Sequence, residues 1–200
     1  LVDTLLSNTS SMRIITTLFF GFILTYSTTA QDWVSVDLNP NGDSYPEGFF
    51  QWGSDMLFTA DDGTGRKVYK TDGTVGGTIA LTGPSFDMGY VFNFEFKEYN
   101  GELYFIGDDG VNGRELWKTD GTVAGTQMVA DVNPSGSSDP TGLCVAGGML
   151  FFGWVPQGLW MTDGTEVGTV QVQDPNSPEF IPYANDGMVE LNGMLIFSGQ

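Results

Sequence analysis

Short apolar runs recur along the chain at a nearly constant spacing. The last residues of four such runs, Phe58, Phe105, Phe152 and Phe197, are 47, 47 and 45 residues apart. No long helical period lies between the runs, and 28 glycines and nine prolines favour tight turns. The pattern predicts short β-strands in a unit that repeats about every 45 residues.

The second copy of this unit predicts four strands, at Phe92–Glu98, Glu102–Gly107, Arg114–Thr119 and Thr126–Val132. The third copy predicts strands at Leu143–Ala146, Met149–Trp154, Gly158–Thr162 and Thr169–Gln173. The first copy runs from about Phe49 to Leu81. Asn-Gly and Asp-Gly pairs lie between the strands, where a tight hairpin turn requires positive φ angles.

A Thr-Asp-Gly-Thr phrase follows the third predicted strand of every copy. Its aspartates are Asp72, Asp120 and Asp163, which are 48 and then 43 residues apart. Asp and Gly are typical turn residues, since Asp hydrogen-bonds the local backbone and Gly accepts positive φ. We therefore interpret these aspartates as structural.

Four antiparallel strands in about 45 residues without a helix match a β-propeller blade. The prediction is an all-β fold, a partial β-propeller of four-stranded antiparallel blades over residues 31–200. Its three whole blades lie at about residues 49–84, 90–134 and 141–175, and the next blade starts at about residue 186.

One further echo concerns the N-terminal side of the first blade. The sequence from Asp37 to Gly42 matches that from Asp131 to Gly136, 94 residues later. Because the later copy follows a fourth strand, Trp33–Leu38 is predicted to be a donated fourth strand of a blade absent from this sequence.

Tyr69, Trp117 and Trp160 occupy one equivalent position in the three copies. We interpret them as core aromatics that pack between neighbouring sheets. A row of aromatics that stack on a ligand is the alternative.

The segment Glu115–Thr126 reads ELWKTDGTVAGT. It resembles the tandem ELWxTDGTxxGT repeats of large secreted bacterial proteins, often labelled hyalin-like. The likeness is weaker in the other copies, where Lys67-Val-Tyr69 and Gly158-Leu-Trp160 replace Glu-Leu-Trp. The resemblance implies a β-propeller on the cell surface or released from it, without catalytic residues to transfer.

The N-terminal segment resembles a targeting sequence. Residues 12–30 begin with Met12-Arg13, continue with the apolar run Ile14–Tyr26 and end in small residues, as a secretory signal peptide does. We expect cleavage after Ala30, and residues 1–11 are interpreted as an upstream over-extension. The expected location is extracellular or on the cell surface.

Charge and residue content narrow the possible chemistry. The net charge is −18, which disfavours nucleic acid and anionic membranes as partners. The sequence contains no histidine, the commonest general base and metal ligand. The single cysteine, Cys144, is interpreted as a small core residue.

Two acid pairs, Asp61-Asp62 and Asp108-Asp109, occupy the same loop of consecutive copies. Carboxylates suit calcium, although the EF-hand spacing is absent. Turn formation is the preferred interpretation, with calcium as the alternative and no other cofactor expected.

We therefore predict no catalytic, cofactor-binding or metal-binding residue and no enzyme activity. The predicted function is a non-catalytic scaffold that binds protein or glycan as part of a longer polypeptide. Two alternatives remain open: a propeller enzyme with axial carboxylates that acts on extracellular polysaccharide, and a calcium-dependent structural module.

Overall fold

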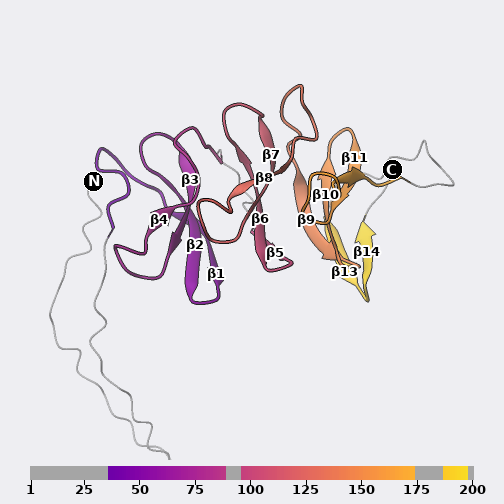
Figure 1. The fold of residues 1–200 in the computed structure, drawn as a ribbon, viewed down its shortest axis with the longest axis horizontal. Helices are drawn as coiled ribbons and strands as arrows, with labels where there is room; N and C mark the ends of the chain where they lie inside the picture. The colour runs from indigo at the N-terminus through magenta and orange to yellow at the C-terminus, as the bar shows by residue number, and fades with distance from the viewer. Residues whose placement is uncertain (1–35, 89–95, 174–186, 198–200) are drawn as a thin grey trace, which may run out of the picture.

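The computed structural model describes residues 36–88, 96–173 and 187–197 (Figure 1). These residues form antiparallel sheets, in which consecutive strands are neighbours. The first sheet contains β1 (Glu47–Trp52), β2 (Asp55–Asp61), β3 (Arg66–Thr71) and β4 (Ile79–Ala80). The second contains β5 (Lys97–Tyr99), β6 (Glu102–Asp108), β7 (Arg114–Thr119) and β8 (Gln127–Ala130). The third contains β9 (Thr141–Ala146), β10 (Met149–Trp154), β11 (Gly158–Thr162) and β12 (Val170–Gln171). A two-stranded sheet follows, with β13 (Met188–Leu191) and β14 (Met194–Phe197).

The prediction of an all-β fold with four-stranded antiparallel sheets is confirmed. The predicted bounds of β7, β10 and β11 agree with the structure. The fourth strands are shorter than predicted, since β8 has four residues and β12 has two. Residues 92–95 of the predicted first strand of the second copy lie outside the described residues. In the part of the chain that the structure describes, no helix is long and apolar enough to span a membrane.

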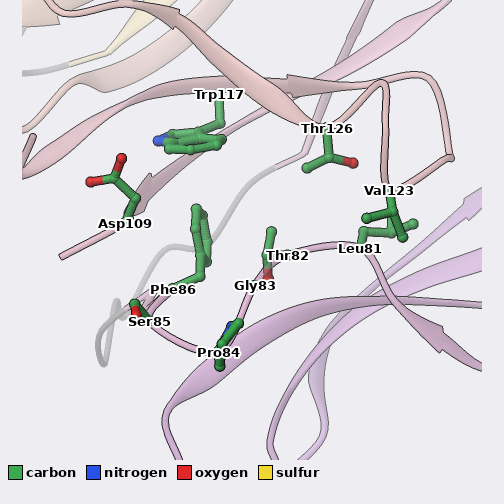
Figure 2. A pocket seen from close by; sticks show the side chains of 10 residues that line it. All are labelled: Leu81, Thr82, Gly83, Pro84, Ser85, Phe86, Asp109, Trp117, Val123 and Thr126. Carbon is green, nitrogen blue, oxygen red and sulfur yellow. The ribbon is translucent and has the colours of Figure 1, made fainter. Parts of the chain in front are cut away.

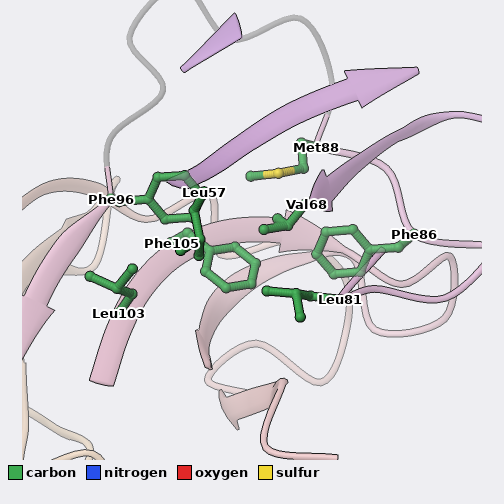
Figure 3. Packing of buried hydrophobic residues seen from close by; sticks show 8 residues of the cluster. All are labelled: Leu57, Val68, Leu81, Phe86, Met88, Phe96, Leu103 and Phe105. Carbon is green, nitrogen blue, oxygen red and sulfur yellow. The ribbon is translucent and has the colours of Figure 1, made fainter. Parts of the chain in front are cut away.

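Consecutive sheets pack against each other through apolar faces. Leu57 and Val68 of the first sheet share one buried cluster with Leu103 and Phe105 of the second sheet (Figure 3). Tyr104, whose side chain points to the opposite face from Phe105, belongs to the next cluster, shared with the third sheet. The second sheet therefore buries one face against its predecessor and the other against its successor.

The segments that lead into the first and third sheets have the same backbone turn, as the match between Asp37–Gly42 and Asp131–Gly136 predicts. The side-chain amide of Asn39 donates to the Asp43 carbonyl at 3.2 Å, and that of Asn133 donates to the Ser137 carbonyl at 2.7 Å. Each segment then passes through a residue with positive φ, which is Tyr45 in one (43°) and Asp139 in the other (45°). These two connectors are residues 39–48 and 133–142.

The prediction that Trp33–Leu38 is a donated strand stays a prediction, because the sheet that it is expected to join is not among the described residues. Residues 36–38 belong to no strand, and residues 33–35 lie outside the described part. The equivalent strand β8 ends at Ala130, which matches Val36, so Val36 alone among residues 36–38 corresponds to a residue of that strand. Leu38 instead packs on the cluster that contains Phe58.

Two arginines at equivalent positions form hydrogen bonds with the segments that precede and follow their sheets. The guanidinium of Arg66 donates to the Tyr45 carbonyl at 3.0 Å, and its own carbonyl accepts from the Met88 amide at 3.0 Å. In the same way the guanidinium of Arg114 donates to the Met88 carbonyl at 2.7 Å, and its carbonyl accepts from the Ser138 amide at 3.1 Å. Each arginine thus links the segment before its sheet to the segment after it.

The residue after each arginine is buried and differs between the copies. Glu115 is fully buried and accepts from the amide of Ser138 at 2.9 Å and from its hydroxyl at 2.6 Å. Burial raises the pKa of Glu115, although these hydrogen bonds oppose that effect. Lys67, at the equivalent position, pairs with Asp62 and the Thr64 hydroxyl. The two copies therefore bury residues of opposite charge at this position, and each charge is paired with hydrogen-bonding or ionic partners.

The Thr-Asp-Gly-Thr turns have the same hydrogen bonds in all three sheets. In the second sheet, the Asp120 carboxylate accepts from the Thr122 amide at 2.9 Å and from its hydroxyl at 2.7 Å. The Thr126 hydroxyl donates to the Thr122 carbonyl at 2.7 Å and lies 2.7 Å from the Thr119 hydroxyl. Because the Thr126 proton is already donated, the Thr119 hydroxyl is the donor of that last bond.

The final glycine of the turn is required because of space. A Cβ atom at Gly77 would overlap the Asp72 carboxylate, whereas a Cβ at Gly76 would meet no atom within 4 Å. The residues of the three copies at these two positions follow this difference in available space. The position of Gly77 is glycine in all three, while that of Gly76 is Ala124 in the second copy and Val167 in the third.

We therefore expect Gly77→Ala to lower the free energy of unfolding by roughly 1–3 kcal/mol, as overpacking does. Gly76→Ala is the matched control and should change it by no more than about 0.5 kcal/mol. Urea unfolding of the full chain, followed by tryptophan fluorescence, measures both. Equal stability of the two variants would contradict the steric explanation.

The same turns predict a loss of stability in acid. Hydrogen bonds from the threonine two residues further on lower the pKa of Asp72, Asp120 and Asp163 below the ordinary value of 3.8. An acid with a lowered folded-state pKa contributes stability above its unfolded-state pKa, and this contribution is lost as the pH falls through the folded-state value. We expect the melting temperature to fall between pH 5 and about pH 3. Asp120→Asn should reduce that fall, and an equal or larger fall in the variant would contradict the assignment.

Candidate functional site

The carboxylates of the first acid pair are occupied by their own loop. Asp61 accepts from the Gly63 amide at 2.7 Å, and Asp62 accepts from the Thr64 amide at 3.0 Å and from its hydroxyl at 2.7 Å. Asp62 also forms an ion pair with Lys67, whose side chain is 3% exposed. This pair therefore shapes the loop between β2 and β3.

The second pair is occupied in a similar way. Asp108 accepts from the Gly110 amide at 2.7 Å. One oxygen of Asp109 accepts from the amides of Val111 and Asn112 at 2.9 and 2.8 Å, and the other accepts from the Asn112 side chain at 2.7 Å. Burial raises the pKa of Asp109, but these hydrogen bonds outweigh it and lower the pKa, so the carboxylate stays ionised at neutral pH.

Neither acid pair is joined by further ligands. Among residues 36–88, 96–173 and 187–197, no three Cys, Asp or Glu side chains form a group that could hold a metal ion. Cys144 is buried in β9, opposite Phe151 of β10. These residues therefore serve loop folding and packing in the structure.

The equivalent aromatics Tyr69, Trp117 and Trp160 lie in three different apolar clusters. Tyr69 stacks on Phe58 with ring centroids 5.6 Å apart, and Trp160 stacks on Phe152 at 6.3 Å. Trp117 is placed differently from both, because it also lines a cavity.

This cavity has a volume of about 330 Å³ and lies between the first and second sheets (Figure 2). The segment after β4, the loop after β6, strand β7 and the turn before β8 line it. Its residues are Leu81, Thr82, Gly83, Pro84, Ser85, Phe86, Asp109, Trp117, Val123 and Thr126. We call it the Trp117 pocket.

Phe86 shapes the pocket. Its ring meets the Trp117 indole edge-to-face, with centroids 4.9 Å apart and an interplanar angle of 87°. The ring fits there only because residue 107 is glycine, since a Cβ atom on Gly107 would overlap it. The Phe86 amide donates to the Gly83 carbonyl at 3.1 Å, which closes the turn around Pro84.

The pocket also has polar groups, because Thr82, Ser85, Asp109 and Thr126 line it beside Trp117. Asp109 brings an ionised carboxylate, whereas the indole N–H of Trp117 has no contact with solvent (Figure 2). The Nε1 atom of Trp117 is buried and has no hydrogen-bond partner in the part of the chain that is described. Figure 2 shows this nitrogen on the side of the indole that lies toward Asp109.

Sequence analysis did not find this pocket, although a signal was present. The turn at Gly83-Pro84 repeats the Asn-Pro turns of the two connectors, with the same backbone hydrogen bond. Phe86 stands where those turns have Gly42 and Gly136. This large residue at a glycine position marks the place where the repeat is broken.

No protein-family model matches the chain, and no curated protein matches it. Among solved structures, a prolyl endopeptidase matches with a TM-score of 0.39 and 17% sequence identity, over 61% of this chain and 18% of that chain. The chain thus spans less than a fifth of that protein. The computationally designed Ika4 protein matches with a TM-score of 0.44 and 13% identity, over 86% of this chain and 94% of that chain. Both likenesses are too distant to bear on function.

Proposed function

We propose that the chain is a module of a secreted or cell-surface repeat protein, a β-propeller that acts as a non-catalytic scaffold and binds protein or glycan. The observation that carries the binding role is the Trp117 pocket, which combines an aromatic wall with a few polar groups. Small-molecule sites typically have this composition.

The stacked sheets support the propeller arrangement. The second sheet is covered on both faces, but β13 and β14 are not. Their uncovered face carries Val189, Leu191, Met194 and Ile196, whose side chains are 59%, 55%, 58% and 45% exposed. Two cross-strand pairs, Val189–Ile196 and Leu191–Met194, make this face apolar. Further blades of the same polypeptide would bury it, as the other sheets bury theirs.

The charge distribution disfavours polyanions as partners. Four cations among the described residues are held by the chain's own carboxylates: Arg66 by Glu47 at 3.1 Å, Lys70 by Asp55 at 3.4 Å, Arg114 by Asp139 at 3.0 Å and Lys118 by Glu102 at 3.0 Å. The remaining surface is strongly acidic, because the net charge is −18. Neutral or cationic ligands are therefore favoured over nucleic acid.

Export is the first testable consequence. When the full chain with a C-terminal tag is expressed in a bacterial host, we expect the tagged product outside the cytoplasm to begin at Gln31. Intact-mass spectrometry of the purified product measures the cleavage site. Replacing Ile14–Tyr26 partly by charged residues is the control and should keep the protein inside. An uncleaved cytoplasmic product from the unaltered chain would contradict the proposal.

Binding is the second consequence. We expect the exported chain to be retained by immobilised neutral polysaccharides or cationic peptides, and not by heparin or double-stranded DNA. Reducing-sugar release from the same polysaccharides is measured in parallel and should stay at background. Binding to neither the neutral polysaccharides nor the cationic peptides would overturn the binding role. Release of sugar would overturn the non-catalytic role.

A further inference from the structure

We propose that the chain associates head to tail, with the outer face of the first sheet in one copy packed on the outer face of β13–β14 in a second copy. This goes beyond the ligand binding proposed above and follows from the way in which consecutive sheets stack. The sheets lie in a row, with the first sheet at one end and β13–β14 at the other (Figure 1). Each end of the row therefore has a face that no sheet covers among the described residues.

The outer face of the first sheet lacks the neighbour that covers the same face of the other sheets. Phe49 corresponds to Phe96 of the second sheet and to Leu143 of the third, since each is 47 residues from the next. Phe96 and Leu143 are 5% and 4% exposed, because each belongs to a cluster shared with the preceding sheet. Phe49 is 62% exposed, although its ring stacks on Phe58 with centroids 5.6 Å apart. This face thus presents an aromatic side chain at a position that the next two sheets bury.

The outer face of β13–β14 is exposed in the complementary way. Ile196 pairs with Val189 as Leu57 of the first sheet pairs with Phe50, so Ile196 occupies the position of Leu57. Leu57 and its counterpart Tyr104 in the second sheet are fully buried in the clusters shared with the following sheet. Ile196 and Val189 are 45% and 59% exposed. This face therefore has the apolar side chains of a sheet–sheet contact.

One contact within the chain shows how the two ends would meet. Phe50 of the first sheet packs against Phe96 of the second, with ring centroids 5.8 Å apart. Val189 occupies the position of Phe50, and Phe49 occupies that of Phe96, so a second copy stacked in the same way places its Phe49 against Val189. The two large clusters each join unlike faces of consecutive sheets, which favours this contact over the pairing of two β13–β14 faces. Such a contact is heterologous, so further copies can add at either end.

Charge sets the conditions under which this association is measured. Two chains of net charge −18 repel each other, and salt screens this repulsion. An apolar contact is not weakened by screening, so we expect the association to strengthen as the salt concentration rises.

The test uses the exported chain without further blades, because such blades would cover β13–β14 in place of a second copy. Sedimentation equilibrium over a range of protein and salt concentrations measures the mass of the particles. Phe49→Glu places a charge on the outer face of the first sheet, and Val189→Glu does so on β13–β14. Val167→Glu is the matched control, because Val167 is 91% exposed in the turn before β12.

We expect the unaltered chain and Val167→Glu to associate alike. Phe49→Glu and Val189→Glu should each raise the apparent dissociation constant about tenfold or more, as the loss of a central contact does. An equimolar mixture of these two variants should regain the affinity of the unaltered chain, because each variant keeps the face that the other lacks. The mixture should stop at a dimer, since both outer ends then carry the added charge. Recovery in the mixture also shows that both variants fold.

Three results would overturn this assignment. The first is a chain that stays monomeric at every protein and salt concentration, which leaves the ligand-binding function to its own test. The second is association that Val189→Glu abolishes and Phe49→Glu leaves intact, because two β13–β14 faces would then pair with each other. The third is a mixture that fails to associate although circular dichroism shows both variants folded.

Discussion

The structure depends on face-to-face burial of small sheets. Each sheet has at most four short strands, and a single hairpin or small sheet is marginally stable in water because half of its side chains would stay exposed. The second sheet resolves this by burying Phe105 against the first sheet and Tyr104 against the third. Because adjacent residues of one strand serve opposite interfaces, a register slip by one residue would expose both. The hairpin turns and the connectors therefore have to fix the register before the faces can pack.

The repeated turns meet this requirement with side chains that replace backbone partners. In each turn, one carboxylate and a set of threonine hydroxyls bind the amides that the sharp change of direction leaves unpaired. These side-chain hydrogen bonds explain which residues of the Thr-Asp-Gly-Thr turn are the same in all three copies. Asp120 and Gly125 are fixed by hydrogen bonding and by space, while Ala124 stands in open surroundings and is replaced by Val167 in the third copy. Arg66 and Arg114 extend this arrangement, because each joins the segment before its sheet to the segment after it.

Local features were therefore predictable from the sequence, and features that arise between sheets were not. The apolar runs and Asn-Gly or Asp-Gly turns predicted strand positions, because hairpin pairing involves neighbours in the chain. The Trp33–Leu38 strand stays a prediction, because a donated strand would pair with a sheet outside the described residues. Glu115 is fully buried against Ser138 of the following connector. Its partner lies 23 residues away, so no local pattern indicates it.

The Trp117 pocket shows how a repeat can acquire an individual site. An aromatic residue at the position of Trp117 does not by itself indicate a site, because Trp160 occupies the same position in the third sheet and packs against the core there. What differs is the surroundings: Phe86 replaces a connector glycine, and its ring lies over Gly107, where a side chain would exclude it. The two residues are 21 positions apart and make sense only together, since Phe86 without Gly107 would clash and Gly107 without Phe86 would leave a gap over β6. Phe86 lies against Trp117 with ring centroids 4.9 Å apart, as Trp154 lies against Trp160 at 5.5 Å. The cavity of about 330 Å³ therefore remains where the loop of Asp109 and the turn before β8 meet the segment of Phe86.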